Sequence, residues 1–272
     1  MNRMELGSHI FEALKAKKEE LIRMYQDSQS EIGYFYLDDL LPSGTAKSIY
    51  LQFPDRNSMK LKKSIREYKY VAAQMSNYNP ILEEAVYAFQ DLRVVSLIKE
   101  ICGISSLYPD ENLYAGGISL MGNKQYLNPH LDNSHDKDRK VWRVLNLLYY
   151  VSPDWKDNYG GNLELWPNGL GDKQLAIHSK FNRLVVMATH DKSWHSVSPL
   201  TVDEKLTRCC VSNYYFSDHP LKNDDEFHVT SFRGRPEQRV VDFMLQLDAK
   251  FRMKIRSLFK KGIVDTKHRY LK

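Results

Sequence analysis

The feature that most constrains this chain is a run of short β-type segments between about residues 108 and 218. They are rich in aliphatic and aromatic residues, and turn dipeptides such as Gly160-Gly161 and Asn168-Gly169 divide them. Short strands at this spacing are typical of an all-β barrel or sandwich, and they argue against a doubly wound parallel sheet. The predicted strands cover residues 114–121, 144–151, 162–166, 174–178, 183–189 and 208–216.

Helical periodicity dominates on both sides of this β region. Apolar residues recur at helical spacing within residues 10–27, 80–101 and 236–259, and a shorter helix is predicted from Pro42 to Tyr50. A short aromatic strand is predicted at residues 32–37. The lysine-rich stretch 54–70 is compatible with a loop, a hairpin or a helix, and its sequence does not decide between them.

The fold class expected is therefore α+β, with a β-barrel or jelly roll and helices packed on its outside. No linker rich in Pro, Gly or Ser separates the parts, so we expect one layered unit. It divides into a helical support region with an entry strand (1–107), the β core (108–235) and a basic amphipathic C-terminal helix (236–272). The apolar positions of that helix, 240, 244, 247, 251, 255 and 258, are expected to pack against the barrel.

The charge distribution argues against nucleic acid as a partner. The net charge is +5, but residues 250–272 hold nine basic residues and one acid, or +8, so residues 1–249 sum to 5 − 8 = −3. The basic segment fits an ordinary amphipathic helix with a solvated face better than a phosphate-binding arm or a membrane-surface helix.

Composition excludes several other classes of protein. With 42% hydrophobic and 27% charged residues, the chain is typical of a globular protein. It has no run of 18 apolar residues, which excludes a transmembrane helix. Residues 1–20 are polar and charged without an apolar core, so we expect no secretory signal and a cytoplasmic location. Three cysteines cannot form a disulfide framework and lie in no zinc pattern.

A candidate metal site begins at His130-Leu-Asp132. In an extended segment, residues two apart point the same way, so one imidazole and one carboxylate would converge. They would supply two of the three ligands of the two-histidine, one-carboxylate triad of non-haem iron. The third candidate is His195, 63 residues after Asp132. His190 is its competitor, but it continues directly from an apolar strand into the charged turn Asp191-Lys192, so His195 is preferred.

Arg208 is a candidate anion-binding residue. It opens the predicted strand 208–216, 13 residues after His195. A lone charge that points into a largely apolar barrel is costly, so such an arginine requires an anionic partner. A carboxylate that accepts both arms of the guanidinium is the best match.

The order of these motifs resembles the iron(II)/2-oxoglutarate-dependent dioxygenases, and most closely their prolyl hydroxylase-like branch. The resemblance covers roughly residues 108–235 and depends on five ordered elements: His130-Leu-Asp132, Gly160-Gly-Asn-Leu-Glu-Leu-Trp166, Phe181-Asn-Arg-Leu-Val-Val186, Trp194-His195 and Arg208. Leu147-Leu-Tyr-Tyr150 and the phrase His228 to Pro236 are similar to further family segments. In one departure, Met121 stands where relatives often place a tyrosine.

The resemblance implies a double-stranded β-helix with iron(II) at its open end. It implies His130, Asp132 and His195 as iron ligands, and Arg208 as the partner of the far carboxylate of 2-oxoglutarate. Tyr150 matches a position where relatives place a hydroxyl on that carboxylate, and Asn146 alternates onto the same face. The implied activity is hydroxylation of an unactivated carbon, coupled to decarboxylation of 2-oxoglutarate to succinate.

Several properties stay open at this point. Dioxygen and 2-oxoglutarate are the implied partners, ascorbate is a candidate reductant, and the primary substrate is a prolyl or peptidyl group or a small metabolite. Two other functions remain as alternatives. One is a non-catalytic barrel that binds a ligand through Trp142, Trp155 and Trp166, and the other is an RNA-associated protein that uses its basic tail.

Overall fold

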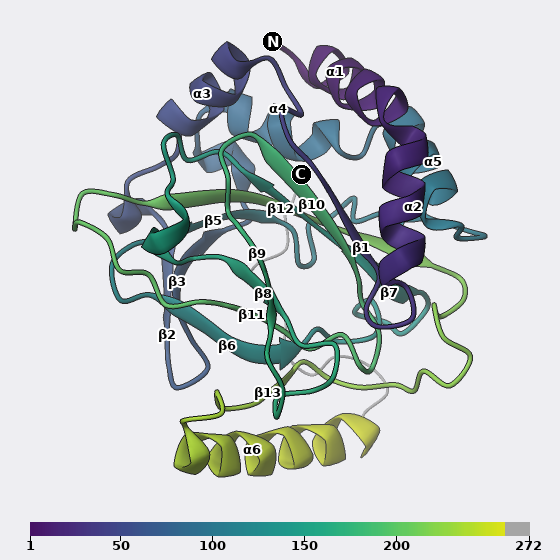
Figure 1. Ribbon diagram of the computed structural model, residues 1–272, viewed down its shortest axis with the longest axis vertical. Helices are drawn as coiled ribbons and strands as arrows, with labels where there is room; N and C mark the ends of the chain where they lie inside the picture. Colours follow the sequence, from purple (N-terminus) through teal and green to yellow (C-terminus); the bar gives the residue numbers. More distant parts are fainter. Residues whose placement is uncertain (259–272) are drawn as a thin grey trace.

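A computed structural model describes residues 1–258. These residues fold into a single curled sheet of 13 strands with helices along one side and one end (Figure 1). Every strand pair is antiparallel, and the order along the sheet is β1-β10-β7-β12-β5-β3-β6-β11-β8-β9. Three further strands pair outside this order: β2 with β3, β13 with β6, and β4 with β12. This arrangement is the α+β jelly-roll type that the sequence predicts.

Thirteen strands make up the sheet, and all six strands predicted in the β region are present. The strands are β1 (Tyr34–Leu37), β2 (Lys60–Lys63), β3 (Glu67–Ala72), β4 (Tyr108–Pro109), β5 (Gly117–Met121), β6 (Tyr126–Leu131), β7 (Trp142–Tyr150), β8 (Leu163–Leu165), β9 (Leu175–Ile177), β10 (Arg183–Ala188), β11 (His195–Val197), β12 (Arg208–Ser217) and β13 (Ser231–Phe232). The lysine-rich stretch forms the β2–β3 hairpin. Since β1 and β3 belong to the main sheet, residues 1–107 contribute strands as well as helices, and the boundary at 107 stays a prediction.

The N-terminal helices are shorter and more numerous than the periodicity predicts. They are α1 (Arg3–Ala16), α2 (Lys18–Ser28), α3 (Ser43–Leu51), α4 (Pro80–Ala88) and α5 (Leu92–Cys102). Asn2 and Glu5 form a capping box that begins α1, and Asp91 caps α5 through the Arg93 backbone N–H. The left-handed Gly103 ends α5, as expected of a glycine just past a helix.

The main core lies between these helices and the convex side of the sheet. Large side chains from both layers are fully buried there, among them Phe35, Phe89, Tyr149 and Tyr215. Asn182 fixes the edge of this layer. Its Nδ2 donates to the Leu41 carbonyl, and its Oδ1 accepts from the Leu41 N–H and from the Tyr149 hydroxyl. One face of the sheet is thus covered, and the other is left to line a pocket.

The C-terminal helix α6 (Arg239–Leu258) packs through a different face from the one predicted. Its buried contact is Leu245, which lies with Val241 in a cluster around Phe232 of β13. Ion pairs from Arg233 to Asp242 and from Arg66 to Asp248 hold this same face on the sheet.

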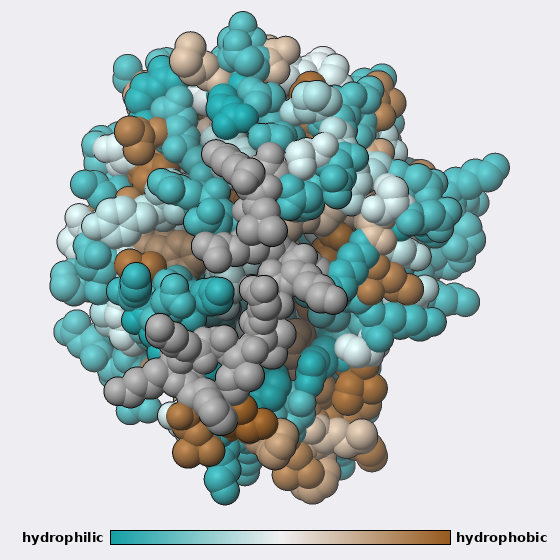
Figure 2. All heavy atoms as spheres, turned by 180° about the vertical axis from the view of Figure 1, so that it is seen from behind, coloured by the Kyte–Doolittle hydropathy of each residue, from teal (hydrophilic) through white to brown (hydrophobic). Residues whose placement is uncertain are grey.

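The expectation that the apolar stripe of α6 packs on the barrel is wrong. Val240, Met244, Leu247, Phe251 and Leu258 are all more than half exposed. Figure 2 shows apolar surface at the lower edge of the molecule, where α6 lies in Figure 1. The rest of the predicted basic tail, residues 259–272, lies outside the described residues. Within residues 1–258, no helix is long and apolar enough to span a membrane.

Candidate active site

Two adjacent strands bring the predicted metal ligands together. His130 of β6 stands directly opposite His195 of β11, with ring centroids 4.1 Å apart. Asp132 follows two residues after His130 and so projects to the same side. One ligand atom from each of the three residues lies within 4.8 Å of the others, and all three side chains are buried.

Backbone carbonyls orient both imidazoles. His130 Nδ1 lies 3.0 Å from the Asn128 carbonyl, and His195 Nδ1 lies 2.9 Å from the Ser193 carbonyl. Each Nδ1 therefore carries the hydrogen, and each Nε2 presents a lone pair. The Nε2 atoms lie 3.9 and 3.8 Å from the Asp132 carboxylate oxygens, too far for a direct hydrogen bond. Burial, followed by the nearby His195, lowers the pKa of His130 to about 3, so its ring is neutral at pH 7.

The Asp132 carboxyl stays ionised despite its burial. Burial, the largest single influence, would raise its pKa, but attraction by His195, Arg143, His130 and Lys69 together outweighs it, and the pKa lies below its ordinary value. Arg143 Nη1 is 3.8 Å from one carboxylate oxygen, and Asn146 Nδ2 donates to the other at 3.5 Å. Two imidazoles and one carboxylate on one side of an open cavity are a donor set that fits iron(II).

A cavity of about 380 Å3 opens in front of this cluster and reaches Arg208. Arg208 begins β12 opposite Met121 of β5, and only 3% of its surface is exposed. Its Nε donates to Ser179 Oγ at 2.9 Å, and its guanidinium carbon lies 4.6 Å from the centre of the Tyr150 ring. Its Nη1 contacts Met121 Sδ at 3.7 Å, and no carboxylate pairs with it among residues 1–258, so a buried cation that lines the cavity lacks an anionic partner.

Tyr150 and Asn146 occupy different parts of the site. The Tyr150 hydroxyl is buried beside Arg208 without a hydrogen bond of standard geometry. Burial raises the pKa of Tyr150 to about 12, although Arg208 opposes the rise, so the group is a neutral O–H donor. Asn146 lines the cavity next to Asp132 and donates to the Tyr214 hydroxyl. Their predicted roles toward 2-oxoglutarate stay predictions: Asn146 lines the cavity, whereas Tyr150 lies against Arg208 and is not among the lining residues.

The competing residues considered from the sequence lie elsewhere. His190 donates from Nε2 to the Ile32 carbonyl and accepts at Nδ1 from the Lys192 N–H, so both ring nitrogens are engaged away from the cluster. None of the three predicted stacking tryptophans lines the cavity. Trp142 packs on His135, Trp155 bonds the Gly160 carbonyl, and Trp166 bonds Ser196.

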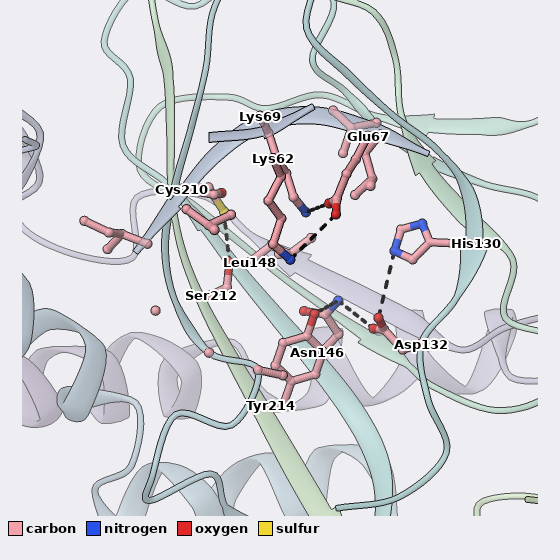
Figure 3. Close-up of a pocket in the computed structure, with 18 of the residues that line it drawn as sticks. Lys62, Glu67, Lys69, His130, Asp132, Asn146, Leu148, Cys210, Ser212 and Tyr214 are labelled. Atoms are coloured by element: carbon pink, nitrogen blue, oxygen red, sulfur yellow. Dashed lines mark hydrogen bonds and ion pairs between the residues drawn. The ribbon is translucent and has the colours of Figure 1, made fainter. Parts of the chain in front are cut away.

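Four charged residues of the cavity were not predicted from the sequence. Lys62, Glu67 and Lys69 line one wall from the β2–β3 hairpin (Figure 3). The sequence shows that lysine is abundant there, but it does not show the strand register that directs these side chains into the cavity. Arg143 lines the opposite wall because a bulge leaves Val144 unpaired between β7 and β12, which reverses the alternation at that point.

Comparison with known proteins supports the jelly-roll fold described above. Residues 116–216, which span all three candidate ligands and Arg208, match the model of the 2OG-Fe(II) oxygenase superfamily. No curated protein matched the sequence.

Solved structures of low sequence identity share the fold. A prolyl-4-hydroxylase from Pseudomonas putida aligns with a TM-score of 0.53 at 16% identity, over 72% of this chain and 98% of that one. A Trichoplax adhaerens prolyl hydroxylase, in complex with a hypoxia inducible factor peptide fragment, aligns with a TM-score of 0.51 at 19% identity, over 74% and 91%. The non-heme alpha ketoglutarate dependent carbocyclase SnoK from nogalamycin biosynthesis aligns with a TM-score of 0.55 at 14% identity, over 81% and 88%. The core is thus a double-stranded β-helix.

Proposed function

We propose that the chain is an oxidoreductase of the 2OG-Fe(II) oxygenase type that hydroxylates an unactivated carbon of its substrate, because residues 116–216 match the model of that superfamily. The observation that carries this proposal is one cavity lined both by the His130, Asp132 and His195 cluster and by the unpaired Arg208. Dioxygen and 2-oxoglutarate are the cosubstrates of this superfamily, and ascorbate is the reductant we expect.

The protein's own part in the reaction is binding and orientation. In this proposal, His130 Nε2, His195 Nε2 and an Asp132 oxygen would hold iron(II), which would supply the oxidising chemistry that accompanies decarboxylation of 2-oxoglutarate to succinate. The Asn128 and Ser193 carbonyls keep each imidazole in the tautomer that can ligate metal. Phe232 stacks on His130 at 5.1 Å and shields that ring from water.

Arg208 and Tyr150 are the proposed partners of the far carboxylate of 2-oxoglutarate. Ser179 holds Nε of Arg208, and Ser179 itself donates to the Gly161 carbonyl, so the guanidinium is fixed before the anion binds. The Tyr150 hydroxyl, buried beside the guanidinium, is the additional O–H donor of this proposal. Donors fixed in advance lower the entropy cost of binding.

The test is turnover of 2-oxoglutarate to succinate in the presence of iron(II). We expect Asp132→Ala to abolish turnover and metal binding, because it removes the anionic ligand. The exposed Asp138→Ala, six residues further along, is the matched control and should behave as wild type. If Asp132→Ala formed succinate as fast as wild type, the ligand assignment would be wrong. Recovery of oxygen from 18O2 in the product separates hydroxylation from a carbocyclisation such as the one for which the carbocyclase SnoK is named.

The two alternative functions gain no support from the described residues. A barrel that binds ligand through tryptophan would present indoles to the cavity, and none of the three lines it. The basic tail of the RNA hypothesis lies largely in residues 259–272, outside the described part of the chain.

A further inference from the structure

One wall of the cavity carries two lysines that share a single carboxylate. Lys62 of β2 and Lys69 of β3 are direct cross-strand partners, and Glu67 precedes Lys69 by two residues on the same face. Glu67 lies 3.6 Å from the Lys62 ammonium and 3.2 Å from that of Lys69. Figure 3 shows both ammonium groups directed into the cavity, across from Asn146 and Asp132.

This pairing leaves one positive charge uncompensated on the wall. Like charges placed directly opposite in a sheet destabilise it, and one carboxylate balances only one of the two lysines. Among residues 1–258, no second acidic group forms an ion pair with either lysine. The side chains are only 36% and 18% exposed, so water screens the excess charge incompletely. Such an arrangement is stabilised by an anion from outside the chain.

The cavity as a whole also has an excess of positive charge. Its lining includes four cations, Lys62, Lys69, Arg143 and Arg208, and two anions, Glu67 and Asp132, which gives 4 − 2 = +2. If the proposed function is correct, iron(II) adds two positive charges and 2-oxoglutarate adds two negative ones. The loaded site would therefore still carry +2, and Arg208 would already be matched by 2-oxoglutarate. One of the two unmatched charges lies at the lysine wall, and the other is that of Arg143, whose neighbour Asp132 would be matched by the iron.

On the premise of the proposed function, we propose that the primary substrate is a small anionic molecule whose carboxylate or phosphate group binds Lys62 and Lys69. These lysines are then specificity residues that anchor one end of the substrate. The other end would be held near the His130, Asp132 and His195 cluster across the cavity. A cavity of about 380 Å3 suits a metabolite better than a folded partner, and small-molecule sites typically measure about 300–1,000 Å3.

The test compares charged and neutral members of matched pairs. A panel of carboxylic acids and phosphate monoesters is assayed beside the corresponding amides and alcohols, with succinate formation from 2-oxoglutarate as the readout. We expect only the charged members to stimulate succinate formation. Whether the acids or the phosphate monoesters stimulate it more shows which anionic group the substrate carries. For the best compound, Lys69→Met and Lys62→Met should each lower kcat/KM about 10- to 100-fold, the usual effect of losing one charged hydrogen bond.

Lys63→Met is the matched control for Lys62→Met. Lys63 is the next residue on β2, it is exposed, and its ammonium lies over the Tyr68 ring at 4.8 Å instead of in the cavity. This variant should match wild type with every compound. All three variants should keep the KM for 2-oxoglutarate within about twofold of wild type, and circular dichroism checks that each is folded.

Each other result counts against the proposal. Equal response to charged and neutral members, or no response to any charged member, overturns it. So does a rise in the KM for 2-oxoglutarate in Lys62→Met or Lys69→Met, because the lysines would then bind the cosubstrate. Failure of the proposed function is a separate result, in which iron(II) and 2-oxoglutarate neither stabilise the wild-type protein nor yield succinate.

Discussion

Replacement of Arg208 by methionine separates binding of 2-oxoglutarate from stability of the fold. The variant loses the hydrogen bond to Ser179 and the contact over the Tyr150 ring, which together contribute about 2–5 kcal/mol. It also removes a buried cation that has no carboxylate partner within the described residues, and burial of such a charge costs several kcal/mol. Since these contributions are of similar size and opposite sign, we expect the protein without ligand to melt within a few degrees of wild type.

The effect on the liganded protein is much larger. At 100 times its Kd, a ligand stabilises a protein by about 2.7 kcal/mol, which for a chain of this size raises Tm by about 5–10 °C. Arg208→Met removes two guanidinium hydrogen bonds to a carboxylate, each about 1.5–3 kcal/mol, so Kd should rise at least about 100-fold. At the same concentration of 2-oxoglutarate, the remaining stabilisation is at most about 0.4 kcal/mol, or about 1 °C.

The assay is thermal unfolding with a redox-inert divalent metal, with and without 2-oxoglutarate. Arg208→Lys is the informative control, because it keeps the charge but loses the planar pair of donors, and its shift should fall between wild type and Arg208→Met. A shift in Arg208→Met equal to that of wild type would refute the assignment of Arg208. A collapse of Tm in the absence of ligand would show instead that Arg208 is mainly structural.

Two further substitutions test neighbouring parts of the structure. Gly161→Ala should raise the Kd for 2-oxoglutarate, measured by calorimetry, at least about tenfold, because the new Cβ would lie 2.7 Å from Cδ of Arg208. The control is Gly169→Ala, which should leave Kd unchanged because Gly169 has a similar positive φ but open space around it. Asp242→Asn should speed amide exchange across α6 about fivefold, because the partly exposed ion pair of Asp242 with Arg233 contributes about 1 kcal/mol. Substitution of the exposed Glu237 by Gln is the control and should leave exchange unchanged. The Arg233 hydrogen bond lowers the pKa of Asp242, so this contribution is complete above the unfolded value of about 3.9 and is lost as pH falls through the folded value. A wild-type Kd in Gly161→Ala, or wild-type exchange rates in Asp242→Asn, would contradict the corresponding contact.

The strands and the ligand cluster were predictable because their signals are local. Period-2 alternation and turn dipeptides mark strands without reference to distant residues, and His130 and Asp132 share a face simply because they are two positions apart. The choice of His195 over His190 also depended on a local observation, the charged turn after His190. Its physical basis is now clear, because His195 pairs with His130 across β11 and β6, whereas both nitrogens of His190 bond to backbone.

The packing face of α6 was mispredicted because periodicity identifies an apolar stripe but not its partner. The orientation of the helix is set by contacts distant in sequence, from Arg66 to Asp248 and from Leu245 to the cluster around Phe232. These contacts lie on the more polar side of the helix. An apolar stripe shows that a helix is amphipathic, and only the tertiary structure shows which of its faces the sheet covers.

The lysine wall and Arg143 depend on strand register, which a single sequence specifies only weakly. A shift of one residue in the β2–β3 hairpin would direct Lys62 and Lys69 to the opposite face, and without the bulge at Val144 the side chain of Arg143 would point out of the cavity. This explains why the chain's total charge was uninformative about its site. Residues 1–249 carry a net −3, yet the cavity within them is lined by two more cations than anions. Register concentrates those cations on one surface, and a partly buried surface of one sign selects ligands of the other sign more strongly than the net charge of the protein does.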